Sequence, residues 1–374
     1  MTAQTMHAVH LTGHGGFEKL EYRTDVPIPT PSAQEVLINV TAAGVNNTDI
    51  NTRTAWYSKA VATATNQGGC EGFGEVDQKD SSWAGSAIQF PRIQGADCCG
   101  IVVAVGEGVS ESRIGERVLV RTMHDDFEKL GSLDFFTLGS EMDGGFAQYL
   151  TIHEKAVYAV DSEWSDVELA SVPCAYSTAE NMLHRTKLGA ERVLITGASG
   201  GVGSAAVQLA KRRGAEVIAL ASPAKFEQVK ALGADTVLAR DADLVAELGA
   251  DSVDLVVDLV AGDEWPKLLD VLKRGGRYAT SGAIAGPMVS LDVRTLYLKD
   301  LTFFGCTYQE AVVFQNLVGY IERNEIKPAV AATYALSDIV TAQQDFLAKQ
   351  FTGKLVLIPP SLEILGAPVA HSSR

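Results

Sequence analysis

The sequence has 374 residues, of which 46% are hydrophobic and 21% are charged, and its formal net charge is −15. This length predicts about two domains, each large enough to bury a core. The acidic balance argues against binding to nucleic acid or to anionic lipid, because both need clustered Lys and Arg.

The start of the chain and the cysteines predict a cytoplasmic protein. The opening stretch MTAQTMHAVHLTGHGG has no basic segment followed by an apolar core, so no signal peptide is predicted. No apolar run approaches the roughly 18 residues that would cross a bilayer. The five cysteines are odd in number and scattered, which fits a reducing compartment better than a disulfide framework.

The first part of the chain, to about residue 160, is typical of a β-rich, barrel-like module. Short apolar and alternating runs are separated by Gly, Pro and Asn, as in a series of short strands. These runs are HAVHLTG (7–13), EVLINVTAAGV (35–45), CGIVVAVG (99–106), ERVLVRT (116–122) and FAQYLTI (146–152). Residues 58–90 lack periodicity and are rich in Gly, Ala, Ser and Asp, so we expect either a functional lid or a locally mobile segment there.

From about residue 164 the pattern changes to an alternation of helices and strands. The strands are apolar and rich in β-branched residues, which predicts a parallel sheet covered on both faces. The predicted strands are RVLIT (192–196), EVIALA (216–221), DTVLA (235–239), VDLVVD (253–258), GRYATSG (276–282) and LTFFGCT (301–307). The predicted helices are at 166–186, 202–213, 224–232, 241–248 and 263–274. Residues 311–360 predict two further helices and a strand, and residues 361–374 a loose tail.

The strongest local signal is the stretch ERVLITGASGGVGSAAVQLAKRRGAEVIALAS. Its glycines, Gly197, Gly200 and Gly203, lie where a buried strand ends and a helix begins, and Gly201 and Val202 complete the turn. Such glycines permit a tight turn, close approach of a pyrophosphate to the backbone and close packing of helix on strand. The helix N-terminus adds N–H donors and a partial positive charge. The pattern predicts a dinucleotide site, with a tight turn that binds no ligand as the alternative.

The end of the next strand favours NADPH over NADH. NAD sites often place Asp or Glu about 20 residues after the glycines, on the ribose 2′-hydroxyl. This strand ends in Leu220, Ala221 and Ser222, with Lys225 close behind and no carboxylate. A 2′-phosphate suits these residues better, because Ser222 can donate a hydrogen bond and Lys225 can neutralise charge. In the alternative, Lys225 is a solvated residue in the first turn of a helix.

The order of these parts resembles the medium-chain dehydrogenase/reductase superfamily over roughly residues 6–358. The similar motifs are GVNNTDI, RIQGADCCGIVVAVGEGVS, IGERVLV, GGFAQYLTI, STAENML, GASGGVGSAAVQLAK, LYLKDLTFFGCT and GKLVL. The resemblance implies an α/β fold with the active site in a cleft between two domains. A GroES-like, β-rich catalytic domain would comprise residues 1–163 and 311–374, with an insertion at 58–90 that has no counterpart. A Rossmann domain with a doubly wound parallel sheet would comprise residues 164–310.

The same resemblance predicts that the site holds no zinc. Zinc-dependent members have Cys where this sequence has Asn46, and the GHE stretch becomes GAD, with Ala96 and Asp97. Cys174, in CAYST, matches the third ligand. A catalytic zinc needs three protein ligands and an open position, and Asn is a poor ligand. The region of the structural zinc lobe has only two adjacent cysteines where four are needed. A weak metal site on Asp97 and Cys174 is the alternative.

The stretch GVNNTDINTRTAWY resembles that of zinc-independent quinone oxidoreductases and enoyl or enone reductases, which implies catalytic roles for its side chains. Tyr57 is expected to donate a proton or hydrogen bond to the acceptor oxygen, or else is a half-buried ring under the insertion. Asn46 is expected to bond the cofactor or a substrate carbonyl. Thr48 supplies a second hydroxyl or simply caps the turn. Asp49 is expected to orient the turn.

The resemblance also implies which residues surround the nicotinamide half of the cofactor. Thr178 is expected to meet the carboxamide, and Lys354 to approach the cofactor. The residues expected to line the same half are Gly282, Ala283, Gly305 and Cys306. The alternative for the glycines is that they only form turns at strand ends.

Together these observations predict an NADPH-dependent oxidoreductase that reduces a quinone, enone or enal without zinc. A conjugated acceptor spreads the developing charge into an enolate or hydroquinone anion, whereas a ketone concentrates it on one oxygen. The apolar strand at 300–305 is expected to pair across a homodimer, because an exposed strand edge invites aggregation. The alternatives are a zinc-type alcohol dehydrogenase and a non-catalytic NADPH-binding protein.

Overall fold

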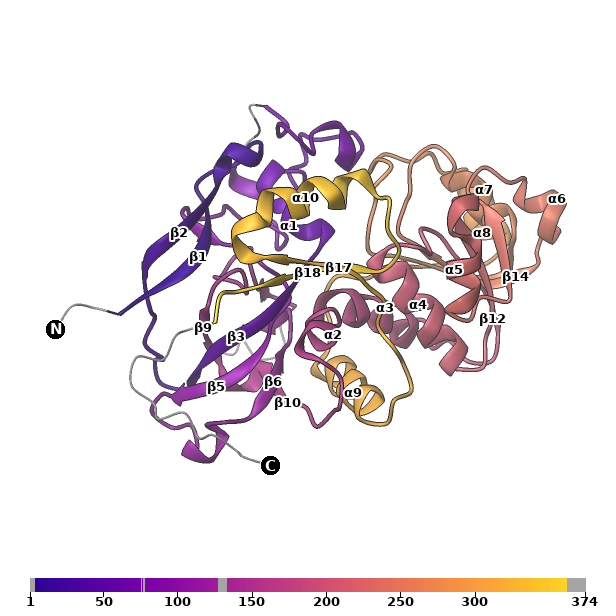
Figure 1. Cartoon of the computed structure of the whole chain (residues 1–374). Coiled ribbons are helices and arrows are strands. Elements are labelled where there is room, and N and C mark those ends of the chain that lie inside the picture. The colour runs from indigo at the N-terminus through magenta and orange to yellow at the C-terminus, as the bar shows by residue number, and fades with distance from the viewer. Residues whose placement is uncertain (1–3, 75, 77, 127–132, 362–374) are drawn as a thin grey trace.

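The computed structural model describes residues 4–74, 76, 78–126 and 133–361, and it shows two parts side by side (Figure 1). The N-terminal strands, joined by two strands from the C-terminal region, make up one part, and a parallel sheet with its helices makes up the other. The predicted α/β fold, with a β-rich domain and a Rossmann-like domain, is confirmed. The predicted tail at 361–374 lies, apart from its first residue, outside the described residues.

The β-rich part is built around a seven-stranded sheet in the order β10-β6-β5-β3-β18-β17, with β9 also paired to β3. The strands of this sheet are β3 (Glu35–Val45), β5 (Cys99–Val105), β6 (Arg117–Val120), β9 (Tyr149–His153), β10 (Val157–Ala159), β17 (Val330–Ala335) and β18 (Lys354–Ile358). Two smaller sheets contain β1 (Thr5–Leu11), β2 (Leu20–Pro27) and β4 (Arg92–Ile93), and β7 (Met123–Asp125) and β8 (Phe135–Thr137). The helices of this part are α1 (Asn47–Thr54), α2 (Asp166–Ala170) and α10 (Ile339–Ala348).

Strand β3 organises this part because both of its edges are paired. One edge pairs with β5, and the other pairs first with β9 and then with β18. Val36, Ile38 and Val40 are buried at alternate positions, as the two-residue period of a strand requires. They belong to the core between the sheets of this part. The end of β3 is therefore held in place from both sides, which fixes the start of α1.

The second part is a six-stranded parallel sheet in the order β13-β12-β11-β14-β15-β16. Its strands are β11 (Arg192–Ile195), β12 (Glu216–Ala221), β13 (Thr236–Ala239), β14 (Val253–Asp258), β15 (Leu272–Thr280) and β16 (Thr302–Gly305). Its helices are α3 (Pro173–Arg185), α4 (Gly201–Arg212), α5 (Phe226–Ala231), α6 (Leu244–Leu248), α7 (Trp265–Asp270) and α8 (Val293–Leu298). The chain winds outward from β11 and then from β14 in opposite directions, so the strand order reverses between these two neighbours.

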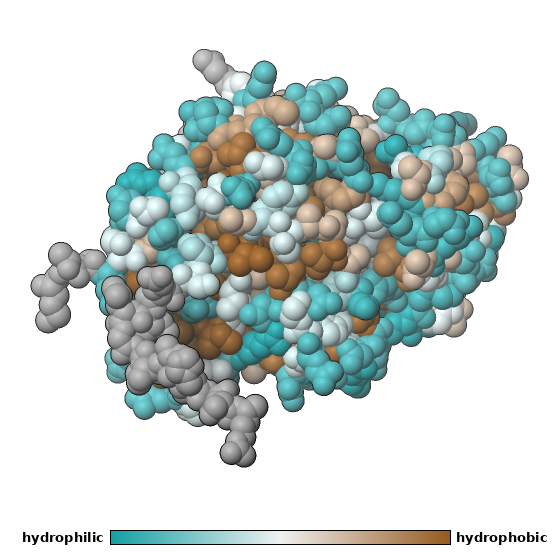
Figure 2. All heavy atoms as spheres, in the orientation of Figure 1, coloured by the Kyte–Doolittle hydropathy of each residue, from teal (hydrophilic) through white to brown (hydrophobic). Residues whose placement is uncertain are grey.

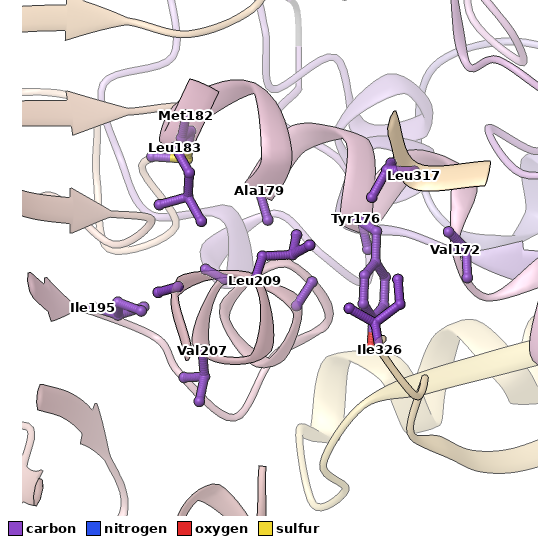
Figure 3. Packing of buried hydrophobic residues seen from close by; sticks show 14 of the residues in the cluster. Val172, Tyr176, Ala179, Met182, Leu183, Ile195, Val207, Leu209, Leu317 and Ile326 are labelled. Carbon is purple, nitrogen blue, oxygen red and sulfur yellow. The ribbon is translucent and has the colours of Figure 1, made fainter. Parts of the chain in front are cut away.

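Helices α3 and α4 pack closely on one face of this sheet. Figure 3 shows Ala179 and Leu183 of α3 next to Leu209 of α4, with Ile195 of β11 beside them. The small side chain of Ala179 lets the two helices approach. This packing supports the N-terminus of α4, where the glycine turn lies.

The C-terminal region crosses from one part to the other. Helix α9 (Ala311–Glu322), predicted to belong to the catalytic domain, packs on the helices of the parallel sheet. The Tyr320 hydroxyl donates to Glu180 Oε1 at 3.2 Å, and the guanidinium carbon of Arg212 lies 3.6 Å from the centre of the Tyr320 ring. The chain then returns to the β-rich sheet in β17, a strand that the sequence pattern did not predict.

No helix within the described ranges is long and apolar enough to cross a membrane. Figure 2 shows hydrophilic side chains over most of one face, with apolar side chains gathered in a band across its middle.

Candidate functional site

The glycine turn joins β11 to α4 with a backbone geometry that favours glycine at two positions. Gly197 has a φ of +59°, in the left-handed region. A Cβ at Gly203 would lie 2.2 Å from the carbonyl oxygen of Gly197, so no side chain fits there. Gly200 is exposed and Gly201 begins the helix, so unpaired N–H groups at this helix end can meet a phosphate. The turn fits a dinucleotide pyrophosphate.

This turn lies at the carboxyl edge of the parallel sheet, where the strand order reverses. Ligands of doubly wound sheets bind at such a reversal. Asp258, at the end of β14, is buried and accepts hydrogen bonds from Thr196 Oγ1 and from the Tyr278 hydroxyl, both at 2.6 Å. Asp258 thus connects the neighbouring ends of β11, β14 and β15 and holds this edge of the sheet in place.

Hydroxyl and cationic groups gather past the ends of β12 and β13. Ser222 follows β12 directly. Lys225 Nζ donates to the carbonyl oxygens of Lys349, at 2.8 Å, and of Phe351. Burial lowers the pKa of Lys225, and the positive charge of Arg240, just past β13, lowers it further. Because an ammonium has three N–H donors, Lys225 keeps one for a ligand, and the two adjacent cations favour an anion.

The residues predicted to line the nicotinamide lie at the carboxyl ends of β15 and β16. Gly282 and Ala283 follow β15, Gly305 ends β16, and Cys306 follows it directly. The backbone N–H of Cys306 donates to the carbonyl oxygen of Thr280 at 2.8 Å, which keeps the two strand ends together. These four residues share one edge of the sheet with the glycine turn.

Thr178, predicted to meet the carboxamide, lies on α3 and is buried. Its hydroxyl donates to the carbonyl oxygen of Cys174 at 2.8 Å. On the same helix, Asn181 Nδ2 donates to the carbonyl oxygen of Tyr308 at 3.0 Å, just beyond β16. Helix α3 therefore runs next to the strand ends that carry the other predicted nicotinamide residues.

A buried cluster of Asn46, Asp97 and Lys354 joins segments that are far apart in the sequence. Lys354 Nζ donates to Asn46 Oδ1 and, at 2.9 Å, to Asp97 Oδ2. Asn46 Nδ2 donates to the same Asp97 oxygen at 2.7 Å and to the carbonyl oxygen of Gly44 at 3.3 Å. The other Asp97 oxygen accepts from the backbone N–H of Cys174 at 2.6 Å. Both amide hydrogens of Asn46 are used here, so Asn46 can donate to a ligand only by releasing Asp97 or Gly44.

Lys354 also connects this cluster to the glycine turn. A Cβ at Gly201 would lie 3.0 Å from Cδ of Lys354, so the lysine stem passes against the start of α4. One residue earlier, the backbone N–H of Gly353 donates to the carbonyl oxygen of Ser199 at 3.2 Å. The β-rich part and the predicted cofactor turn meet at this lysine.

The donor set in this cluster does not fit a catalytic zinc ion. Of the three residues at the family's ligand positions, Ala96 offers no donor and Asn46 directs its oxygen at the Lys354 ammonium. Of these three residues, only Cys174 has a side chain that zinc commonly binds, whereas a catalytic zinc needs three protein ligands. Within the part of the chain that the structure describes, no group of three His, Cys, Asp or Glu side chains could hold a metal ion.

GVNNTDI forms the end of β3 and the start of helix α1, and Asp49 fixes this junction. Asp49 Oδ2 accepts from the backbone N–H of Asn46 at 2.7 Å, and Oδ1 accepts from that of Ala96 at 3.3 Å. Burial raises the pKa of Asp49 to about 7, and the charge of Asp97 contributes to the rise. Asp49 thus orients the polar stretch from inside the protein.

Tyr57 and Thr48 form a pair of hydroxyl groups beside this cluster. The Tyr57 hydroxyl donates to Thr48 Oγ1 at 3.0 Å. Burial raises the pKa of Tyr57 above its ordinary value, and Cys174 and Asp49 are close enough to raise it further. A phenol shifted in this direction stays protonated at neutral pH and can donate a hydrogen bond to an oxygen that gains charge.

Two family models match this chain: residues 77–162 match the alcohol dehydrogenase GroES-like domain, and residues 201–323 match the zinc-binding dehydrogenases. A solved structure from Sinorhizobium meliloti 1021, named as a candidate alcohol dehydrogenase, is 45% identical. The two structures superpose with a TM-score of 0.85, covering 96% of this chain and 98% of the other. The chain belongs to the medium-chain dehydrogenase/reductase superfamily.

Within the medium-chain dehydrogenases/reductases, the chain is similar to quinone oxidoreductases. The quinone oxidoreductase of Lama guanicoe is 28% identical over 369 residues, which cover 94% of this chain and 97% of the relative. The NADPH-dependent alkenal/one oxidoreductase of Arabidopsis thaliana is 27% identical over 360 residues, which cover 95% of this chain and 80% of the relative. This member of the superfamily is therefore an oxidoreductase of the quinone oxidoreductase-like branch.

Three features of this dehydrogenase/reductase site were not predicted from the sequence. Asp97 and Lys354 are 257 positions apart, so no local pattern joins them. Arg240 follows a strand end, and the same reasoning that singled out Ser222 could have found it. Trp83, which stacks on Tyr57, lies in a segment without periodicity that gives no signal at all.

Proposed function

We propose that this protein is a zinc-independent, NADPH-dependent reductase of quinones and α,β-unsaturated carbonyl compounds. The observation that carries the proposal is the Lys354 ammonium, which bonds Asp97 and also Asn46, the residue at a position where zinc-dependent members of the superfamily have a ligand. Because the Lys354 ammonium is already paired with Asp97, we expect neutral donors to stabilise charge on the acceptor oxygen. The hydroxyl groups of Tyr57 and Thr48 are such donors, 3.0 Å apart.

A conjugated acceptor suits such donors. Hydride addition to the β-carbon of an enone gives an enolate, to which a proton then adds at the α-carbon, and a quinone gains a hydride and a proton to become a hydroquinone. The glycine turn and the strand ends at the carboxyl edge of the parallel sheet would hold NADPH, which would supply the hydride. A saturated ketone would place the full charge on one alkoxide oxygen, which two hydroxyl groups stabilise less well.

The side chains of the cluster then have distinct roles. Tyr57 donates its hydrogen bond to the acceptor oxygen in exchange for its present partner, Thr48, whose own proton remains available as a second donor. Asn46 and Lys354 form a hydrogen-bonded polar surface beneath the proposed reactants. Asn46 can donate to a cofactor or substrate carbonyl only by giving up one of its present acceptors. Thr178 meets the carboxamide by the same kind of exchange.

The preference for NADPH rests on the cations past β12 and β13. A ribose 2′-phosphate placed there would meet the Ser222 hydroxyl, the remaining N–H of Lys225 and the exposed guanidinium of Arg240. No carboxylate follows β12 to bind a free 2′-hydroxyl, since this strand ends in Ala221 and Ser222.

The protein is proposed to form a homodimer through β16. This strand is the last in the parallel sheet and pairs with β15 on one side. Helix α8, which leads into it, exposes Val293, Tyr297 and Leu298 by more than half of their surface, at 60%, 59% and 56%. A second β16 edge would continue the sheet and cover these apolar side chains.

Steady-state oxidation of NADPH tests the proposed activity. The acceptors are a small quinone, a small enone and the saturated ketone that corresponds to the enone. We expect turnover with the quinone or the enone and a much lower kcat/KM with the ketone. Turnover confined to the ketone or to alcohol oxidation would overturn the proposal, and tight NADPH binding with no turnover would favour a non-catalytic protein.

A further inference from the structure

We propose that the described residues of the segment 58–90, which the sequence predicts as an insertion, are part of the active site, and that Trp83 among them is a positioning residue for Tyr57. The inference rests on the proposed role of Tyr57 as hydrogen-bond donor. The ring of Trp83 stacks on that of Tyr57, with ring planes 6° apart and ring centres 6.3 Å apart. Trp56 meets the same ring edge-on, with centres 5.9 Å apart and planes at 70°.

These ring contacts matter because the Tyr57 hydroxyl must exchange its hydrogen-bond partner during the reaction. Tyr57 lies just past the end of α1, beyond Ala55, whose φ of +62° turns the chain out of the helix. The Tyr57 hydroxyl donates to Thr48 Oγ1 and also has a side-chain hydrogen bond with Asn51. Once the phenol donates to an acceptor instead, its bond to Thr48 is broken, and the bond with Asn51 alone does not fix the tilt of the ring. The flanking rings then keep the phenol aimed at the acceptor, and an error of about 1 Å at this point can cost a large part of the rate.

Trp83 can serve as a fixed support because hydrogen bonds hold the insertion on both sides of it. The backbone N–H of Trp83 donates to Ser140 Oγ at 3.2 Å, and that of Ala84 to Glu141 Oε1 at 2.8 Å. On the other side, His14 Nε2 lies 2.8 Å from Ser81 Oγ. Hydrogen bonds on both sides of Trp83 indicate that this part of the segment is ordered, and they disfavour the locally mobile segment that was one of the two sequence-based predictions.

His14 and Arg53 tie the insertion to the catalytic helix itself. His14 Nδ1 lies 2.9 Å from the carbonyl oxygen of Thr52 in α1, and since a carbonyl only accepts, Nδ1 carries the proton. Arg53 is fully buried and donates to the carbonyl oxygens of Gly69, at 2.7 Å, and Gly15, at 2.8 Å. The insertion and the helix that precedes Tyr57 therefore form one hydrogen-bonded unit.

The same insertion reaches the other half of the reaction. The backbone N–H of Thr65 donates to the carbonyl oxygen of Ile284 at 3.2 Å. Ile284 directly follows Ala283, one of the residues predicted to line the nicotinamide. One segment thus contacts both the loop next to the expected hydride donor and the ring of the expected proton donor, which is the arrangement that a positioning element needs.

The test compares four variants in NADPH-dependent reduction of one small enone: Trp83→Ala, Trp83→Phe, Tyr57→Phe and the double variant Trp83→Ala/Tyr57→Phe. For Trp83→Ala we expect kcat to fall about tenfold, with the KM for NADPH unchanged and a larger solvent isotope effect on kcat. Trp83→Phe keeps a ring and should restore most of the rate. In the Tyr57→Phe background, Trp83→Ala should cause little further loss, because Trp83 acts through the phenol.

The controls separate positioning from general damage. Ile88→Ala removes buried apolar volume from the same insertion and should leave the solvent isotope effect unchanged. Trp83→Leu fills space without a ring, and it replaces Trp83→Ala if thermal unfolding shows that the alanine variant is not folded. If Tyr57→Phe keeps full activity, the proposed donor is wrong and this inference falls with it. If Tyr57→Phe is impaired but Trp83→Ala and Trp83→Leu are not, or if the two losses multiply, only the positioning role is overturned.

Discussion

Lys354 holds a buried positive charge at the candidate site. Its ammonium is buried and pairs with Asp97, which is also buried. Removing one partner of such a pair leaves an uncompensated buried charge. We expect Lys354→Met to lower the free energy of unfolding by about 3–5 kcal/mol, measured by denaturant titration. The double variant Lys354→Met/Asp97→Asn should recover part of the loss, and equal stability of Lys354→Met and the parent protein would contradict the buried pair.

Asp49 should make stability fall as the pH rises. Burial raises its pKa to about 7, so between its unfolded value of about 4 and about 7 the folded state binds the proton more tightly. The stabilisation is therefore complete at low pH and is lost as the pH rises through about 7, by an amount on the order of a few kcal/mol.

The measurement compares the parent protein with Asp49→Asn, which cannot titrate. The contributions of other titrating groups cancel in the difference in unfolding free energy, parent minus variant. This difference should decrease between about pH 5 and about pH 8, because only the parent protein has the carboxyl of Asp49. Two parallel curves over this range would show that Asp49 does not titrate as its burial implies.

At the scale of elements, the ends of β12 and β13 should decide which cofactor is used. Arg240→Ala removes a cation that is exposed, and Lys225→Ala removes one that also bonds the 349–351 backbone. We expect each variant to lose about tenfold in kcat/KM with NADPH and little with NADH, since each phosphate contact by a cation is a strong hydrogen bond. Arg240→Ala is the cleaner variant. Equal losses with both cofactors would place the 2′-phosphate elsewhere.

The elements that the sequence revealed are those with a regular apolar pattern. The predicted strands at 35–45 and 216–221 match β3 and β12 residue for residue, because their apolar positions follow the strand period or form a continuous buried run. Helix α1 was not predicted, since Ile50 is its only apolar residue and its burial comes from polar contacts made by distant segments. In the same way, the family resemblance pointed to Asn46 and to Lys354 separately, but only the fold brings the two side chains together.

At the scale of the whole molecule, the exposed apolar residues of α8 and the edge of β16 should join two copies. The chain has a mass of 39.8 kDa, and we expect twice this mass by light scattering after size-exclusion chromatography. Tyr297→Lys/Leu298→Lys places two charges on exposed positions, so it should halve the mass without lowering the melting temperature by much. A monomeric parent protein, or a dimer unaffected by the two lysines, would contradict pairing at this edge.

We propose that a lysine-centred polar cluster and a phenol together support the reduction of conjugated acceptors without a metal. The measurement that tests it most directly is NADPH-dependent enone reduction by purified protein of known zinc content, before and after dialysis against a strong chelator. We expect the same turnover in both samples and far less than one zinc ion per chain. One zinc ion per chain, with turnover lost on chelation and restored by zinc, would contradict the claim.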